Sequence, residues 1–139
     1  MLTRVLLALV LISCAVAPSA AEETKVVTLG LTDHEVNEAE LAQGAALPVP
    51  RFNTPGVAYA LIADVKHGDT VKVALKKDGA QLMHNTETLA ENKATFLLQA
   101  GKRGVPAGGW PEGSYTAAVK VTRDGKVVVE QESEPKAFE

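Results

Sequence analysis

Apolar residues recur at every second position in several short runs of this chain, and this period of two constrains the fold more than any other feature. Successive side chains of a β-strand point to opposite faces, so such a run buries one face and exposes the other. The runs cover residues 57–65, 71–75, 95–99, 115–121 and 127–129, and a first strand is expected at 25–31. In the run at 57–65, one face carries Val57, Tyr59 and Leu61.

The residues between these runs fit the same architecture. Asp78-Gly79 and Asp124-Gly125 tolerate the positive φ angles that a tight type I′ hairpin requires. The longer segment 32–55 reads as a crossover that opens with a possible short helix, which Asp33 could cap and which ends near Gly44. Together these features predict an all-β antiparallel sandwich.

A short motif before the strand at 115–121 narrows the class further. Residues 109–115, GWPEGSY, resemble the Trp-Pro-x-Gly-x-Tyr signature of immunoglobulin-like sandwiches found in bacterial secreted and envelope proteins. The resemblance extends to Phe52, which is similar to the phenylalanine that opens the core of that family, and to Phe138 near its usual end. It implies an immunoglobulin-like β-sandwich of about seven strands. It also implies a non-catalytic module with Trp110, Pro111, Gly113 and Tyr115 as its structural motif.

Elementary packing gives the motif a role of its own. Pro111 and Gly113 turn the chain, and Tyr115 then enters the core with its hydroxyl free to bond backbone, as in a tyrosine corner. Trp110 would close one end of the sandwich, and its indole N–H needs a partner if it is buried.

The first 21 residues read as an export signal. Arg4 precedes an apolar run at residues 5–12, and Ser19 and Ala21 supply the small side chains that signal peptidase requires. This predicts a single domain at 22–139 that is periplasmic or secreted. An alternative is a lipoprotein, because residues 11–14, LISC, resemble a lipobox in which Cys14 would carry a lipid anchor. No other stretch is long and apolar enough for a transmembrane segment.

Composition and charge argue against several functions. The formal net charge of −3 does not suit a nucleic-acid surface, which needs clustered basic residues. Cys14 is the only cysteine and lies in the signal, so the domain has no thiol for catalysis. Ser114 lacks the context of a nucleophile elbow. The carboxylates of Glu130 and Glu132 are read as a solvated strand edge. We therefore expect neither an enzyme nor a bound cofactor.

Two weak groupings leave a metal-binding alternative open. His34 and Glu38 are one helical turn apart, and Met83-His84 could offer a thioether and an imidazole to a soft ion. A periplasmic protein that handles copper or zinc is thus the second hypothesis.

The preferred hypothesis is a binding or accessory module that docks on another envelope protein through loops at one end of the sandwich. The loop at 101–113 carries Lys102, Arg103 and Trp110, and tryptophan and arginine are frequent anchors of interfaces. The alternative for Trp110 is a buried plug that closes the core.

Overall fold

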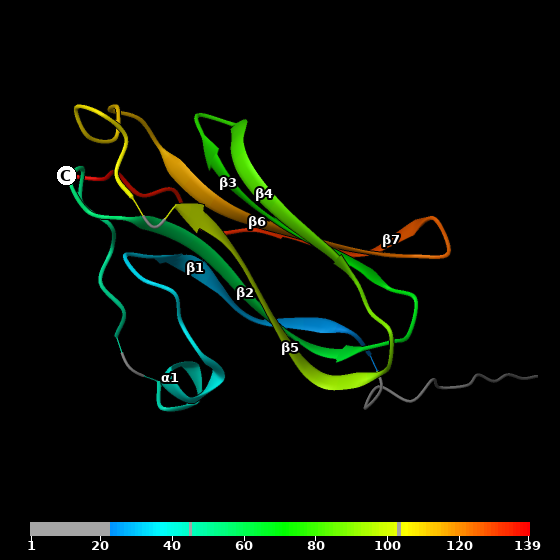
Figure 1. The fold of residues 1–139 in the computed structure, drawn as a ribbon. Helices are drawn as coiled ribbons and strands as arrows, with labels where there is room; N and C mark the ends of the chain where they lie inside the picture. The colour runs from blue at the N-terminus through cyan, green and yellow to red at the C-terminus, as the bar shows by residue number, and fades with distance from the viewer. Residues whose placement is uncertain (1–22, 45, 103) are drawn as a thin grey trace, which may run out of the picture.

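A computed structural model describes residues 23–44, 46–102 and 104–139, which form two antiparallel β-sheets packed face to face (Figure 1). One sheet has the order β1 (Lys25–Thr32), β2 (Gly56–Val65), β5 (Lys93–Lys102). The other has the order β4 (Ala80–Thr88), β3 (Thr70–Lys77), β6 (Tyr115–Arg123), β7 (Lys126–Glu132). A short helix, α1 (Glu38–Ala42), lies between β1 and β2. The predicted seven-stranded all-β sandwich is confirmed.

Both Asp-Gly pairs form the expected hairpins. Asp78 and Gly79 have φ angles of 50° and 84° and join β3 to β4, while Asp124 and Gly125 have 51° and 79° and join β6 to β7. Positive φ at both central residues is what a type I′ turn requires, and its twist matches that of the flanking strands. These turns fix the register of the two hairpins on either side of the β3–β6 pair.

The central strand of the three-stranded sheet is buried on both faces. Ala58, Ala60 and Ile62 face the other sheet and belong to the core, whereas the face with Tyr59 and Leu61 is buried outside that cluster. The crossover contributes to the outer side of this sheet: the side chain of Gln99 on β5 accepts from the backbone N–H of Val36 at 2.7 Å and donates to its carbonyl at 2.8 Å.

The helix of the crossover begins later than the sequence suggested. Asn37 is the N-cap, because its side chain accepts from the backbone N–H of Glu40 at 2.9 Å and the Glu40 carboxylate accepts from the N–H of Asn37 at 3.2 Å. This reciprocal capping box replaces the predicted cap at Asp33. The helix ends just before Gly44, whose φ is 67°.

Three of the four edge strands carry a β-bulge, and each bulge turns an apolar side chain outward. The extra residues are Val27 on β1, Leu82 on β4 and Val128 on β7, and all three are exposed. A bulge interrupts the ladder and twists the edge, which protects it against pairing with another chain. The fourth edge, β5, is partly covered, since the side-chain amide of Asn85 on β4 donates to the carbonyl of Gln99 at 3.0 Å.

A buried ion pair closes the end of the sandwich farthest from the helix. Both oxygens of Asp69, whose side chain is fully buried, accept from the Arg123 guanidinium at 2.8 Å, and one of them also accepts from the backbone N–H of Lys66. Arg123 donates as well to the hydroxyl of Thr24 at 2.7 Å. This network ties the start of β1 to the β2–β3 turn and the end of β6. Within the described residues, no helix has the length and apolar character to cross a bilayer.

Candidate functional site

Trp110 is a buried plug. Its side chain lies at the opposite end of the sandwich, which we call the Trp110 end; loops 46–55 and 104–114 and the C-terminal segment 133–139 meet there (Figure 1). Trp110 is only 5% exposed, and its indole N–H donates to the carbonyl of Thr54 at 2.8 Å. Its ring makes edge contacts with Tyr115 and Phe138, whose centroids lie 5.9 Å and 5.6 Å away.

Tyr115 forms the predicted tyrosine corner at the start of β6. Its hydroxyl donates to the carbonyl of Pro111 at 2.6 Å, and burial raises the pKa of its phenol. The ring of Phe138 stacks on that of Tyr115 at a centroid distance of 3.9 Å and an angle of 6°. Backbone hydrogen bonds in both directions between Tyr115 and Lys136 hold the C-terminal segment in place. The motif and Phe138 therefore form a packed aromatic layer, which we call the floor of the Trp110 end.

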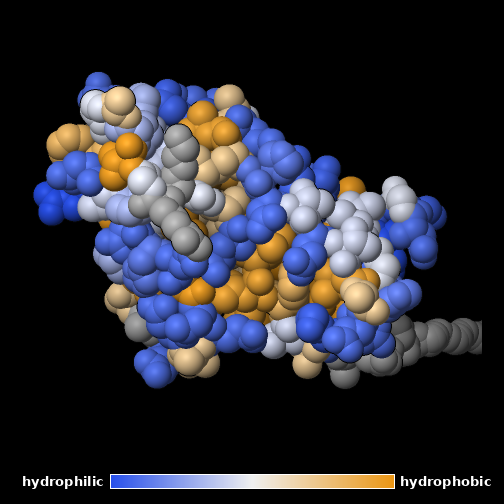
Figure 2. All heavy atoms as spheres, viewed as in Figure 1, coloured by the Kyte–Doolittle hydropathy of each residue, from blue (hydrophilic) through white to orange (hydrophobic). Residues whose placement is uncertain are grey.

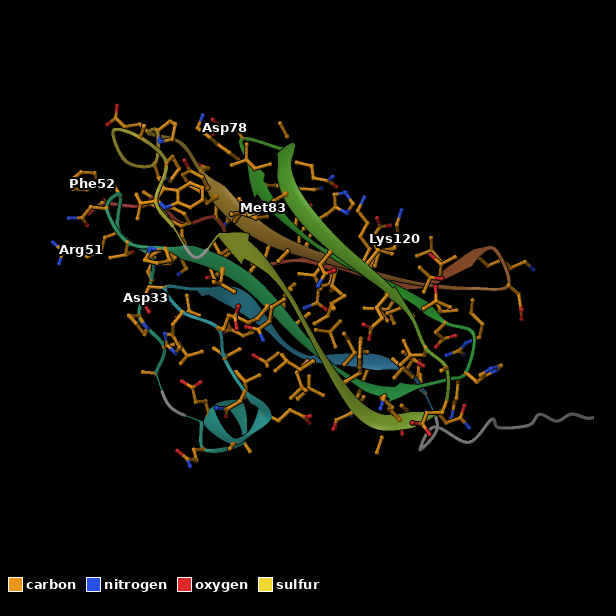
Figure 3. All side chains as sticks on the ribbon, viewed as in Figure 1. Asp33, Arg51, Phe52, Asp78, Met83 and Lys120 are labelled. Atoms are coloured by element: carbon orange, nitrogen blue, oxygen red, sulfur yellow. The ribbon has the colours of Figure 1, made fainter. Side chains whose placement is uncertain are left out.

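Phe52 lies on this floor and is 48% exposed, so it does not belong to the core as the resemblance implied. Its backbone is fixed on both sides: its N–H donates to the carbonyl of Glu139 at 3.3 Å, and its carbonyl accepts from the N–H of Trp110 at 2.8 Å. Gly109, with φ of 88°, packs against the ring, where a Cβ would come within 2.7 Å. Figure 3 shows Phe52 and Arg51 at the tip of the loop before β2, directed away from the two sheets.

A hollow of about 520 Å³ opens beside Phe52. It is lined by three aromatic residues, two glutamates and two small residues: Phe52, Trp110, Phe138, Glu112, Glu139, Gly113 and Ala137. We call it the end hollow. Val49 and Val105 are also exposed on loops of this end, where Figure 2 shows hydrophobic atoms among hydrophilic ones. The end hollow therefore combines the exposed ring of Phe52 with the exposed carboxylates of Glu112 and Glu139.

The two basic residues expected to contribute to binding are only partly covered by the structure. The backbone of Lys102 pairs with Gly56 at the end of β5, which brings the loop after it to the Trp110 end. The side chain of Lys102 and the whole of Arg103 lie outside the described residues. The export signal at residues 1–21 and the candidate lipid-anchored Cys14 lie outside them too.

His34 does not pair with Glu38. Its Nδ1 lies 2.7 Å from Asp33 and its Nε2 lies 2.8 Å from Glu40, and these hydrogen bonds raise the pKa of the imidazole above its ordinary 6.5. The carboxylate of Glu38 instead accepts from the hydroxyl of Thr95 at 2.7 Å. The hydrogen bonds of His34 to Asp33 and Glu40 connect the segment after β1 to the first turn of α1.

Met83 and His84 also point apart. They are neighbours on β4, and Met83 packs against the core while His84 is exposed. Because adjacent side chains of a strand lie on opposite faces, their sulfur and imidazole cannot converge on one ion. Among the described residues, no three His, Cys, Asp or Glu side chains come together in a way that could hold a metal.

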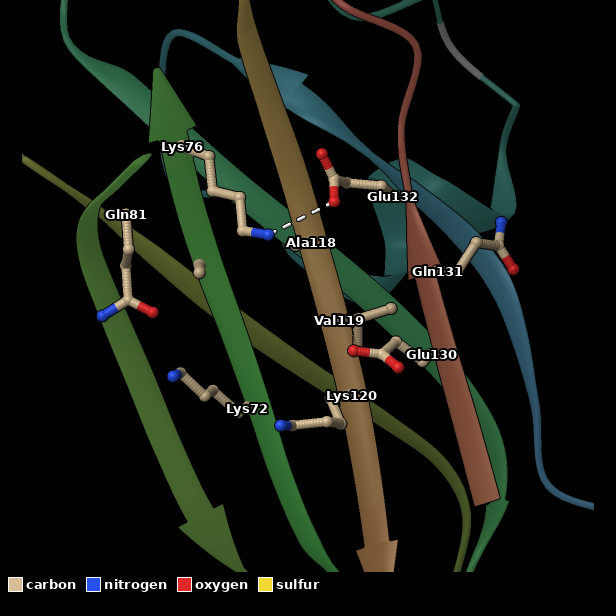
Figure 4. Close-up of a pocket in the computed structure, with 10 residues that line it drawn as sticks. Lys72, Lys76, Gln81, Ala118, Val119, Lys120, Glu130, Gln131 and Glu132 are labelled. Carbon is tan, nitrogen blue, oxygen red and sulfur yellow. Dashed lines mark hydrogen bonds and ion pairs between the residues drawn. The ribbon is translucent and has the colours of Figure 1, made fainter. Parts of the chain in front are cut away.

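The outer face of the four-stranded sheet contains a second hollow, of about 310 Å³ (Figure 4). Its floor is Ala74 and Ala118, and charged side chains surround it. Lys76 pairs with Glu132 at 3.2 Å, while Lys72 and Lys120 are directly opposite each other on β3 and β6. No aromatic side chain lines this hollow, so it lacks the kind of anchor that the end hollow has.

Comparison with models of known protein families gives no match to this chain, and no curated protein matches its sequence. The geometry of the Trp110 end is therefore the basis for a functional proposal. The sequence motif predicted Trp110 and Tyr115 there, whereas only the family resemblance implied a core position for Phe52. A signal for Phe52 was present, because an aromatic residue between Pro50 and Pro55 cannot continue a strand and lies in a loop.

Proposed function

We propose that this chain is a non-catalytic binding or accessory module of the cell envelope, and that it docks on another envelope protein through the Trp110 end. The observation that carries the proposal is the exposed ring of Phe52, held in place by backbone hydrogen bonds on both sides. Full burial of a phenylalanine side chain stabilises by roughly 1.5–3 kcal/mol, and a ring that is half-exposed leaves much of this available to a partner.

Two further features support docking at this end. A well-positioned anchor loses little conformational entropy on binding; the backbone of Phe52 is hydrogen-bonded on both sides and its ring lies against Gly109. The bulged edges of β1, β4 and β7 make strand addition unfavourable, so the loops are the better surface. In this arrangement Phe52 is the anchor and Trp110 supports it from below. The export signal at residues 1–21 would place the module in the periplasm or outside the cell.

Site-specific photo-crosslinking in the native envelope tests this proposal. A benzoylphenylalanine at position 52 is expected to capture one discrete partner, because the ring at that position would contact it directly. The matched control is the same residue at Val127, which is similarly exposed but lies by the β6–β7 turn at the other end. Capture at both positions alike, or at neither, would contradict the proposal.

A further inference from the structure

We infer that the end hollow receives a basic side chain of the protein partner, with arginine as the preferred residue. This inference rests on the proposed function, since it names the chemistry of the contact at the same site. It follows from two properties of the lining, its aromatic rings and its carboxylates, which together favour a cation.

The aromatic part comes mainly from Phe52, whose ring is 48% exposed, while the lining residues Trp110 and Phe138 are 5% and 7% exposed. The faces of aromatic rings carry partial negative charge and attract a guanidinium or ammonium group within about 6 Å of the ring centre. A guanidinium is planar and weakly hydrated, so it stacks on rings more readily than a lysine ammonium does. The hollow of about 520 Å³ has room for such a long side chain.

The charged part comes from Glu112 and Glu139, which are exposed at the hollow. Neither forms an ion pair with any residue in the described part of the chain. Arg51 and Lys136 line the adjoining surface with Glu139, but neither lies within ion-pair distance of it. The two carboxylates therefore remain available to a cation that enters from outside.

Other occupants fit this lining less well. An aliphatic side chain would fill the hollow but would remove water from the carboxylates without pairing them, and burying an unpaired charge is costly. An acidic side chain would meet both carboxylates and be repelled. An arginine can place its guanidinium face on the exposed ring of Phe52 and donate its N–H groups to the carboxylates.

The single tryptophan of the chain allows a direct test, because Trp110 lines the hollow and its fluorescence and indole N–H resonance report on it alone. The probe is N-acetyl-arginine amide, and the control is N-acetyl-citrulline amide, which has the same shape without the charge. We expect the arginine probe to shift the indole resonance at millimolar concentration and to bind at least about threefold more tightly than citrulline. Equal binding of the two probes, or binding of neither, would overturn the inference.

Substitutions test whether the carboxylate of Glu112 is responsible for the preference for arginine. Glu112→Gln should weaken the arginine probe about threefold or more and leave the citrulline probe unchanged, whereas Glu87→Gln, an exposed carboxylate on β4, should change neither. If Glu112→Gln left the arginine affinity intact, the inference would be wrong. Near-ultraviolet circular dichroism confirms that each variant keeps its fold. The two proposals can be refuted independently. If position 52 crosslinks to a partner but the arginine probe does not bind, the docking role is retained and only the inference of a basic side chain in the end hollow is refuted.

Discussion

Replacing Asp69 by asparagine should be among the most destabilising isosteric changes in this protein. The side chain is fully buried and accepts three hydrogen bonds, two of them from the Arg123 guanidinium. Asparagine has the same shape, but its amide group would turn a donor toward Arg123 and leave that cation unpaired. Removing one partner of a buried pair costs about 3–5 kcal/mol. Because Arg123 is 33% exposed and water can solvate it, we expect about 3 kcal/mol.

Urea unfolding followed by Trp110 fluorescence measures this loss. With a denaturant slope of about 1.5 kcal/mol per molar, 3 kcal/mol lowers the midpoint by about 2 M at pH 7. Glu130→Gln is the control, because this exposed carboxylate makes no ion pair in the described part of the chain. It should move the midpoint very little. A midpoint for Asp69→Asn within error of the wild type would refute the role given to the Asp69–Arg123 pair.

The difference in the free energy of unfolding between wild type and Asp69→Asn should also become smaller at low pH. The hydrogen bond from Arg123 lowers the pKa of Asp69 below its ordinary 3.8, so the carboxylate stabilises the folded state above that pH. This contribution is lost as the pH falls from 3.8 through the lowered pKa, because the unfolded state takes up a proton at a higher pH than the folded state does. The gap between wild type and Asp69→Asn should therefore narrow as the pH falls below 3.8. A constant gap would show that the variant acts through packing and not through charge.

Three further outcomes are expected. Tyr115→Phe should lower the free energy of unfolding by about 1–2 kcal/mol in urea titrations, because the carbonyl of Pro111 loses its partner. NMR titration should give His34 a pKa above 6.5. Because the pKa is raised, the protonated imidazole stabilises the folded state fully below pH 6.5, and this effect disappears at higher pH. A titration midpoint at or below 6.5 would contradict this. Gly101→Ala should destabilise by more than about 1 kcal/mol in thermal melts, because its Cβ would come within 2.5 Å of a backbone oxygen, whereas Gly104→Ala, with open space around it, should be neutral.

The strands that place apolar residues at alternate positions could be predicted from the sequence, whereas β4 could not. Residues 115–121 alternate because Tyr115, Val119 and Val121 face the core while Lys120 faces water. β4 shows no such pattern, since nearly all of its residues are exposed at the edge of the sheet. The alternation of apolar residues also could not show which face of β2 points to the core. A strand that is covered on both faces carries apolar residues on both faces.

The site could be predicted only where it depends on contacts that are local in sequence. The motif around Trp110 and Tyr115 is local in sequence, and its hydrogen bond and packing follow from a short turn. The exposure of Phe52 depends on contacts with Glu139 and Gly109, which lie 87 and 57 residues away in sequence. The position of His34 beside Glu40 likewise depends on where α1 begins, and that was set by Asn37.

The most direct test of the docking role is to co-purify the partner from the native envelope with Phe52→Ala and Val127→Ala, each compared with the wild type. Both variants remove an exposed apolar side chain, so both should keep the wild-type stability within about 1 kcal/mol. We expect the partner to be lost with Phe52→Ala and retained with Val127→Ala. Retention of the partner by a folded Phe52→Ala protein would contradict it.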